Sequence, residues 1–525
     1  MTTADAAANT TETLAGFVER HEQQRPDGIA IRFGDRQWSW AGWTSRIRRA
    51  AGALRAAGVQ RGQCVAFLDK NHPACLETLI AAASIGAVAA IVNWRVIGDE
   101  LVHVLNDSGA RLLFVGAELH PTLEAIRTRV PALERIVVVG DSPDRGDEYE
   151  SWLAAATPID PDPEVDDTDT ALVIYSSGTT GRPKGVLLSQ RALVNHIVNL
   201  APPFPFEEGD ANLVAMPLFH VGGVAYAFFG IMAGVPTFLT REPEAATLIG
   251  AIQGGATHAF FVPPVIARFL DAGEAATSAI SGLRYLVYGA APMPMPLLQR
   301  ALEAWPDINF VQVYGQTELC GAITQLGAAE HRDSDRQGLL LSAGKAAPGN
   351  EIRIVDPDSG EQLPAGEAGE IWVRSNQRMT GYLNRPEATA DTVTTDDWVR
   401  TGDIGRLDAD GYLYIEDRLK DMVITGGENV YGPEVESVLI GHPAIDDAAI
   451  IGVPDDFWGE SVKAIVVTNT ETEPGDIIEF CRRHLAGYKC PRTVDFVAAL
   501  SRRAGGKILK ATLREPYWQN RARNV

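Results

Sequence analysis

The chain has 525 residues, of which 46% are hydrophobic and 22% charged, a composition typical of a folded globular protein rather than a disordered one. At roughly 150 residues per domain, this length predicts two to four structural units. The formal net charge of -22 argues against binding to nucleic acid and against unaided binding to anionic lipid, because both require clustered Lys and Arg.

The N-terminal stretch carries acidic residues early and lacks a basic region followed by an apolar run, so it does not resemble a signal peptide. The five cysteines are scattered and show no CxxC spacing, which predicts neither a disulfide framework nor a zinc site. A reducing, cytoplasmic location is therefore expected.

Much of the first 400 residues alternates Ala-rich helical patterns with short apolar runs, a pattern that predicts βαβ units with strands buried on both faces. The runs are "GQCVAFL", "ARLLFVG", "ERIVVVG", "ALVIYSS", "LRYLVYG" and "NFVQVYG". This part of the chain is predicted to be α/β. From about 340 to 415, shorter strands and Gly/Pro/Asp turns predict a smaller β-rich unit.

The segment 215–239 is long enough to cross a membrane, but Pro217, His220, Pro236 and several glycines interrupt it. A buried core segment beside a pocket is the preferred interpretation.

The chain after residue 418 predicts a small α+β domain. Its expected strands are "DMVIT", "AAIIGV", "VKAIVV" and "TVDFV", and its expected helices are "PEVESVLIGH" and "DIIEFCRRHLAG". Pro433 suits the first position of the former helix. The predicted domains are therefore residues 1–417 and 418–525.

The stretch "YSSGTTGRPKGV", which begins at Tyr175, combines glycines, hydroxyls and cations directly after an apolar run. Glycines let a backbone approach a polyanion closely, hydroxyls donate to phosphate oxygens, and Lys184 supplies a positive charge. Pro183 precedes Lys184, so the Walker A pattern is not met. By composition alone, a phosphate-binding loop and an ordinary turn both fit.

The order of residues in this stretch closely resembles the phosphate-binding signature of the adenylate-forming superfamily, which contains acyl-CoA synthetases, luciferases and peptide-synthetase adenylation domains. Further segments resemble that superfamily's motifs in the same order over essentially the whole chain. They are "PLFHVGG" at 217–223, "VYGAAPM" at 287–293, "QVYGQTE" at 312–318, "WVRTGD" at 398–403, "EDRLKDMVITGGENVYGPEVE" at 416–436 and "GGKILKATLRE" at 505–515. The wording is most similar to fatty-acid-CoA ligases. The resemblance implies a large N-terminal domain of α/β subdomains with a small β-rich subdomain, followed by a small mobile α+β domain.

The resemblance also implies an ATP and Mg²⁺ site. Glu318 would bind the metal, since Mg²⁺ bridging phosphates commonly takes a protein carboxylate, and Thr317 would contact the α-phosphate. Tyr314 would lie against adenine, and Asp403 would accept the ribose hydroxyls. The full expected ATP-binding set is Ser176, Ser177, Gly178, Thr179, Thr180, Gly181, Lys184, Gly289, Ala290, Ala291, Tyr314, Gly315, Asp403 and Arg418.

Lys507 resembles the superfamily's catalytic lysine, which bridges the carboxylate and the α-phosphate during adenylation. Lys510 is the weaker candidate for that role. Lys420 matches the hinge about which the C-terminal domain turns, and Gly426 and Gly427 match the backbone past which the thiol arm of CoA enters.

His220, Val221 and Gly222 are expected at the wall of the acyl pocket, with His220 near the acyl carboxylate. A histidine hydrogen-bonded in the core is the alternative. Amino-acid adenylating domains typically place Asp beside Phe here, whereas this chain has Phe219 and His220, which favours an acid without an amine.

The resulting hypothesis is a ligase that forms an acyl-AMP with release of pyrophosphate and then acylates CoA, with ATP, Mg²⁺ and CoA as cofactor and cosubstrates. A medium- or long-chain fatty acid is the preferred substrate, and aryl or alicyclic acids are alternatives. Loading of a carrier-protein thiol and a non-catalytic nucleotide or acyl sensor are the rival functions. A monomer and a homodimer are both compatible with the sequence, and no nucleic acid or membrane span is expected.

Overall fold

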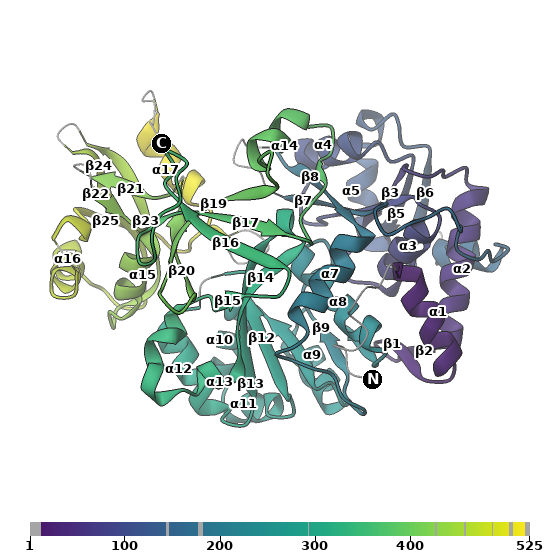
Figure 1. Ribbon diagram of the computed structural model, residues 1–525, viewed down its shortest axis with the longest axis horizontal. Helices are drawn as coiled ribbons and strands as arrows, with labels where there is room; N and C mark the ends of the chain where they lie inside the picture. The colour runs from purple at the N-terminus through teal and green to yellow at the C-terminus, as the bar shows by residue number, and fades with distance from the viewer. Residues whose placement is uncertain are drawn as a thin grey trace.

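The computed structural model describes residues 12–142, 146–176, 182–291, 293–419, 421–425, 428–455, 458–485, 487–502 and 508–519. Four sheets organise these residues, and Figure 1 shows the C-terminal elements grouped at one end of the molecule, beside the small sheet built from β16, β17, β19 and β20. The α/β class expected from the sequence is confirmed.

The largest sheet is mixed, with a parallel centre from β1 to β13 and antiparallel strands at both ends. Its order is β15 (Lys345–Ala346), β14 (Gly321–Leu326), β13 (Asn309–Gln316), β12 (Tyr285–Gly289), β11 (His258–Phe261), β9 (Asn212–Val214), β10 (Thr237–Leu239), β1 (Ile29–Phe33) and β2 (Arg36–Ser39).

The second sheet is also parallel at its centre and ends in two antiparallel strands, β8 and β18. Its order is β18 (Gly381–Tyr382), β8 (Lys184–Ser189), β7 (Thr170–Ser176), β4 (Val88–Val92), β3 (Cys64–Leu68), β5 (Leu112–Gly116) and β6 (Arg135–Val139). The six apolar runs expected as strands form β3, β5, β6, β7, β12 and β13.

The third sheet is antiparallel and contains β16 (Asn350–Val355), β17 (Gly369–Ser375), β19 (Trp398–Leu407) and β20 (Leu413–Arg418). It is the β-rich unit expected from about 340, but it starts later than predicted. Lys345 and Ala346 form β15, which belongs to the largest sheet because Ala346 pairs with Thr324 of β14.

The fourth sheet lies in the C-terminal part and contains β22 (Glu428–Val430), β21 (Val423–Thr425), β24 (Gly459–Thr468), β23 (Ile445–Asp455) and β25 (Thr493–Phe496). Its helices are α15 (Gly432–Ile440), α16 (Pro474–Arg482) and α17 (Lys510–Trp518). Pro433 is the second residue of α15 rather than the first, and α16 begins before the expected Asp476 because Pro474 starts it.

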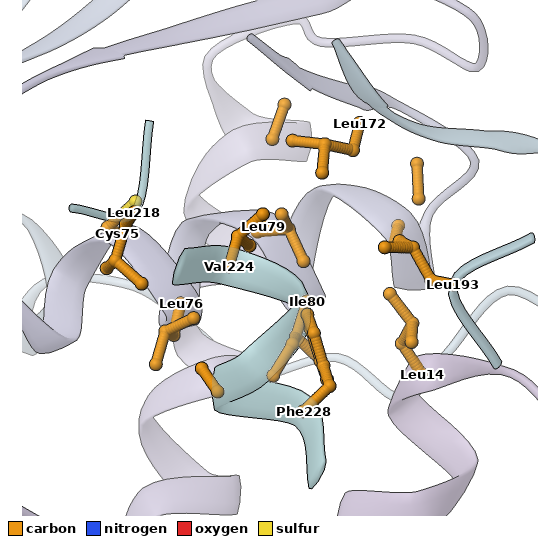
Figure 2. Packing of buried hydrophobic residues seen from close by; sticks show 14 of the residues in the cluster. Leu14, Cys75, Leu76, Leu79, Ile80, Leu172, Leu193, Leu218, Val224 and Phe228 are labelled. Atoms are coloured by element: carbon orange, nitrogen blue, oxygen red, sulfur yellow. The ribbon is translucent and has the colours of Figure 1, made fainter. Parts of the chain in front are cut away.

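Helices of the N-terminal part cover the two large sheets. They are α1 (Leu14–Gln24), α2 (Trp40–Ala56), α3 (Pro73–Ser84), α4 (Gly98–Ser108), α5 (His120–Glu124), α6 (Glu148–Ala154), α7 (Gln190–Leu200), α8 (Val221–Ala233), α9 (Ala245–Gln253), α10 (Pro263–Asp271), α11 (Glu274–Ile280), α12 (Met295–Ala304), α13 (Ala328–His331) and α14 (Pro386–Thr392). Every residue of α3 is buried, and α3, α7 and α8 contribute to one core cluster with strands of both large sheets. Figure 2 shows Val224 and Phe228 of α8 beside Leu76, Leu79 and Ile80 of α3.

The apolar segment 215–239 therefore forms a core helix, α8, flanked by strands, as expected. Within the described ranges, no helix is both long and apolar enough to cross a membrane.

Three contacts tie together segments of the chain that follow β19. The carboxylate of Asp417 accepts a 2.8 Å hydrogen bond from the Gly432 backbone N–H, so β20 is linked to the start of α15. On α17, Lys510 pairs with Glu436 at 2.9 Å, and Arg514 pairs with Asp421 at 2.8 Å. The boundary at 417/418 stays a prediction.

Candidate active site

The predicted nucleotide residues come together where three sheets meet. Strand β7 ends at Ser176 and β8 begins at Lys184, and these two residues pair across the antiparallel hairpin. The hairpin register fixes both ends of the predicted phosphate loop. The loop residues Ser177, Gly178, Thr179, Thr180 and Gly181 lie outside the described residues.

Glu318 lies beside that hairpin, although it comes from the other large sheet. It sits in the short 3-10 turn Thr317–Leu319, directly after β13. Its Oε1 atom accepts hydrogen bonds from the Ser176 hydroxyl at 3.3 Å and from the Tyr382 hydroxyl at 2.9 Å. A carboxylate is thus held at the loop's base by two hydroxyl donors.

Tyr382 is a site residue that sequence reasoning missed. The Lys184 ammonium lies 4.9 Å from the centre of the Tyr382 ring, so one tyrosine contacts both the predicted metal ligand and the predicted phosphate cation. Burial, followed by the Glu318 charge, raises the pKa of Tyr382 well above its ordinary value, so the hydroxyl stays a donor. Its plain "GYLNR" context gave no signal, because the contact is made by the edge strand β18.

A second residue that sequence reasoning missed, Gln377, forms hydrogen bonds to the backbone at and just after the turn Thr317–Leu319. Its fully buried amide donates to the carbonyls of Leu319 at 2.9 Å and Ala322 at 2.7 Å, and it accepts from Asn199 of α7 at 2.9 Å. Met379 also donates its backbone N–H to the Glu318 carbonyl at 2.8 Å. These bonds hold the Glu318 segment rigidly.

The predicted adenosine residues are also assembled. The Tyr314 hydroxyl donates to the Asp403 carboxylate at 2.7 Å, although 88 residues separate the two in sequence order. Asp403 is buried in β19, and its backbone lies opposite Arg418 in the register of β19 with β20. The structure describes the Arg418 backbone but not its side chain.

Two glycines of the expected ATP set are required by close packing. A Cβ atom on Gly289 would lie 2.3 Å from the Val313 carbonyl oxygen, and one on Gly315 would lie 1.9 Å from the Gly321 carbonyl oxygen. Ala290 follows at the end of β12 with a φ of 63°, the left-handed region that favours glycine. The ends of neighbouring strands β12 and β13 thus approach closely, and Ala291 and Thr317 lie in the segments that follow them.

The predicted acyl residues begin helix α8. His220 is the N-cap residue, with its ring 4.6 Å from that of Phe219, and Val221 and Gly222 form the first turn. The structure assigns no ligand to this turn, so its acyl role stays a prediction.

The remaining predicted residues cannot be placed. Lys420, Gly426, Gly427 and Lys507 lie outside the described residues. Lys510 is placed and forms a buried ion pair with Glu436 at 2.9 Å, while the choice between Lys507 and Lys510 as the catalytic lysine stays a prediction.

The donors present fit a magnesium ion that is held largely by its substrate. In the described parts of the chain, no group of three or more His, Cys, Asp or Glu residues could hold a metal ion with protein ligands alone. Mg²⁺ at nucleotide sites typically takes one or two carboxylates and completes its octahedron with phosphate oxygens and water. Glu318 would supply that carboxylate.

Comparison with known proteins identifies the family of the chain. Residues 18–383 match the AMP-binding enzyme family, and residues 434–507 match the AMP-binding enzyme C-terminal domain. The chain belongs to the AMP-binding enzyme family.

Several members are similar over nearly their full length. A fatty acid–[acyl-carrier-protein] ligase of Streptomyces coeruleorubidus is 35% identical, with 98% of each chain covered. A feruloyl-CoA synthase of an Amycolatopsis species is 36% identical, covering 96% of this chain and 99% of the relative. The o-succinylbenzoate CoA synthetase of Bacillus subtilis, solved with its acyl-adenylate, superposes with a TM-score of 0.83 at 29% identity, covering 97% and 98%.

The family establishes the reaction class. The chain is an AMP-forming acid–thiol ligase that uses ATP, Mg²⁺ and CoA. The rival interpretation as a non-catalytic sensor is therefore set aside.

Proposed function

We propose that this chain is an acyl-CoA ligase that activates a carboxylic acid with an apolar body and transfers the acyl group to CoA. The observation that carries the proposal is the grouping of Ser176, Glu318 and Tyr382 beside Lys184, at the foot of a loop with a phosphate-binding composition. This grouping supports the proposal, because it would bring a metal ligand, Glu318, close to a cation for the phosphates, Lys184.

In the first step, the substrate carboxylate attacks the α-phosphate of ATP and pyrophosphate leaves. Lys184 and the loop hydroxyls would hold the β- and γ-phosphates, and Asp403 would hold the ribose, with Tyr314 orienting the carboxylate of Asp403 through their hydrogen bond. Lys507 would neutralise charge as two anions approach. A bound magnesium would add further charge neutralisation at the phosphates.

In the second step, the CoA thiol attacks the acyl carbonyl and AMP leaves. We assign the hinge to Lys420 and the thiol path to Gly426 and Gly427, so that a turn of the C-terminal domain would exchange the lysine loop for the CoA path. One site would thereby serve both half-reactions.

The acyl group is proposed from the surroundings of α8. Gly222, Met216 and Phe260 would form an apolar wall. Such a wall suits the acyl group of a medium- or long-chain fatty acid and that of an aryl acid equally. Relatives named for fatty acids and for ferulate are similar to this chain to nearly the same degree, at 35% and 36% identity. A carrier-protein thiol is the second candidate acceptor, since one of those relatives is a carrier-protein ligase.

A cytoplasmic location is part of the same proposal. All five cysteines are free thiols in the structure, and burial raises the pKa of Cys64 to about 11, as suits unreactive thiols in a reducing compartment.

The test is pyrophosphate release from ATP and Mg²⁺ across fatty, aryl and alicyclic acids, with CoA, with a phosphopantetheinylated carrier, or with neither. Products are followed by mass. Acyl-CoA formed from one acid class is the expected result. Acylation of the carrier alone would replace CoA by a protein acceptor, and the absence of pyrophosphate release with every acid would contradict the proposal.

A further inference from the structure

Helix α4 lies against the second sheet, next to the hairpin of β7 and β8. Its residues Val104 and Leu105 belong to an apolar cluster shared with strands β3 and β5, and Tyr175 of β7 packs against the same cluster. His103 and Asp107 are four residues apart, so they lie on one stripe of the helix. The apolar residues fix α4 on the sheet, and the stripe of His103 and Asp107 is left for polar contacts.

Both residues of this stripe contact the hairpin. The Nε2 atom of His103 lies 3.0 Å from the Pro183 carbonyl oxygen, and because a carbonyl can only accept, Nε2 carries the proton and donates it. The Tyr175 hydroxyl donates to the Asp107 carboxylate at 3.1 Å. Tyr175 is the next-to-last residue of β7, and Pro183 directly precedes β8. One turn of α4 therefore holds both strands of the hairpin where they face each other.

The surroundings of Asp107 fix its side chain and offset its charge. The side chain is 9% exposed, and the Arg385 guanidinium lies 3.5 Å from its carboxylate. The Asp107 backbone carbonyl accepts a further hydrogen bond from the Asn384 side chain at 3.0 Å. Figure 1 shows α4 beside α14, which begins directly after Arg385. Burial, followed by the Asp107 charge, raises the pKa of Tyr175 well above its ordinary value, so its hydroxyl stays a donor.

Tyr175 and Pro183 are chain neighbours of two residues proposed to bind ATP. Ser176, next to Tyr175, pairs across the hairpin with Lys184, next to Pro183. Under the proposed function, Lys184 meets the β- and γ-phosphates, which AMP lacks. A cation whose backbone is fixed before the ligand arrives loses less conformational freedom on binding. The two contacts of α4 should therefore strengthen the binding of ATP and leave that of AMP unaffected.

We propose that His103 and Asp107 are positioning residues for the triphosphate end of ATP. His103 acts through Pro183 on Lys184, and Asp107 acts through Tyr175 on the opposite strand of the hairpin. This inference rests on the proposed function, because it takes Lys184 as the cation for the phosphates. The carboxylate of Asp107 serves as a fixed acceptor, with its charge offset, and not as a ligand of the nucleotide.

The test measures the binding of ATP and of AMP to the full chain by calorimetry, with Mg²⁺ present and no acid. His103→Ala and Asp107→Ala should each weaken ATP binding about 3- to 10-fold, the size of one lost hydrogen bond, and leave AMP binding unchanged. Tyr175→Phe should act like Asp107→Ala, because it keeps the packed ring and removes only the donor.

His103→Gln and Asp107→Asn are the conservative variants. The Gln amide can donate to Pro183 and the Asn carbonyl can accept from Tyr175, so both should recover most of the lost affinity for ATP. Asn106→Ala is the matched control, because Asn106 lies on the same helix but donates to the Arg129 carbonyl at 3.0 Å, away from the hairpin. It should leave both affinities unchanged.

The outcomes separate this inference from the proposed function. Thermal unfolding shows which variants fold, and Tyr175→Phe, which loses a single oxygen atom, keeps the test available if an alanine variant does not fold. A wild-type protein that binds ATP, with variants that leave this affinity unchanged or weaken ATP and AMP equally, would overturn the inference and leave the ligase standing. A wild-type protein that binds neither nucleotide would overturn the proposed function as well.

Discussion

The proposed nucleotide half and the proposed acyl half of the site are built differently. In the proposed nucleotide half, polar groups are paired with one another: Ser176 and Tyr382 with Glu318, and Tyr314 with Asp403. In the proposed acyl half, Gly222 lies against the apolar side chains of Phe260 and Met216. A preassembled polar site serves chemistry that is common to every substrate, whereas an apolar wall selects a substrate by its shape.

The sharpest test of this contrast is Lys507→Ala. If the lysine serves only the chemistry at phosphorus, adenylation should fall by about 1,000-fold for every acid, since charge stabilisation in the transition state is lost. Thioester formation from a preformed acyl-AMP should persist, as measured in single-turnover assays. Lys489→Ala, which removes the half-buried ion-pair partner of Glu434, is the control. Equal loss of both steps would end the proposed division between them.

Glu318→Gln should come next in size. The amide keeps the shape and an acceptor for Ser176 and Tyr382 but removes the charge that would hold the metal, so kcat/KM for ATP should fall about 100-fold. The Mg²⁺ concentration that gives half-maximal activity should rise. Pyrophosphate exchange titrated with Mg²⁺ measures both effects, and the loss should be identical for all acids. A loss that depends on the acid would mean that the two halves are not independent.

Acid should destabilise the protein through His196, a buried residue of α7. The folded-state pKa is lowered to about 3, so the unfolded state binds the extra proton as pH falls below about 6.5. The free energy of unfolding should therefore drop by about 2 kcal/mol between pH 7 and pH 5 from this residue. Urea unfolding at both pH values should show a smaller drop in His196→Gln than in the wild type, while an unchanged drop would contradict this assignment.

Gly222→Ala should have the smallest effect and should be confined to the acyl half. The added methyl group would lie 3.2 Å from Phe260, so the proposed acyl wall beside His220 would shift or lose width. We expect a several-fold change in kcat/KM that grows with the width of the acid and leaves the KM for ATP unchanged. Steady-state kinetics with slender and broad acids measure this change, and a shift in the KM for ATP would count against the separation.

Glu318, Tyr314 and Asp403 were predicted because the short motifs that contain them resemble those of the adenylate-forming superfamily. The structure pairs Tyr314 with Asp403 and Ser176 with Glu318, and their roles toward ATP stay predictions. Tyr382 and Gln377 were not predicted, because their roles depend on pairing between segments about 60 to 200 residues apart. Strand β4 was missed since its run "VAAIV" is alanine-rich and short, and only burial between β3 and β7 identifies it as a strand.

The hydrogen bond from Gly432 to Asp417 has a consequence for the balance between conformers. Asp417 precedes the proposed hinge and Gly432 follows it, so a turn about Lys420 that separates β20 from α15 would break this bond. A hydrogen bond to a charged group contributes about 1.5–3 kcal/mol, which corresponds to a population ratio of roughly 10 to 150. One carboxylate would thus set how often the enzyme visits its second state, and Asp417→Asn would redistribute the two populations without altering a single atom that contacts ATP.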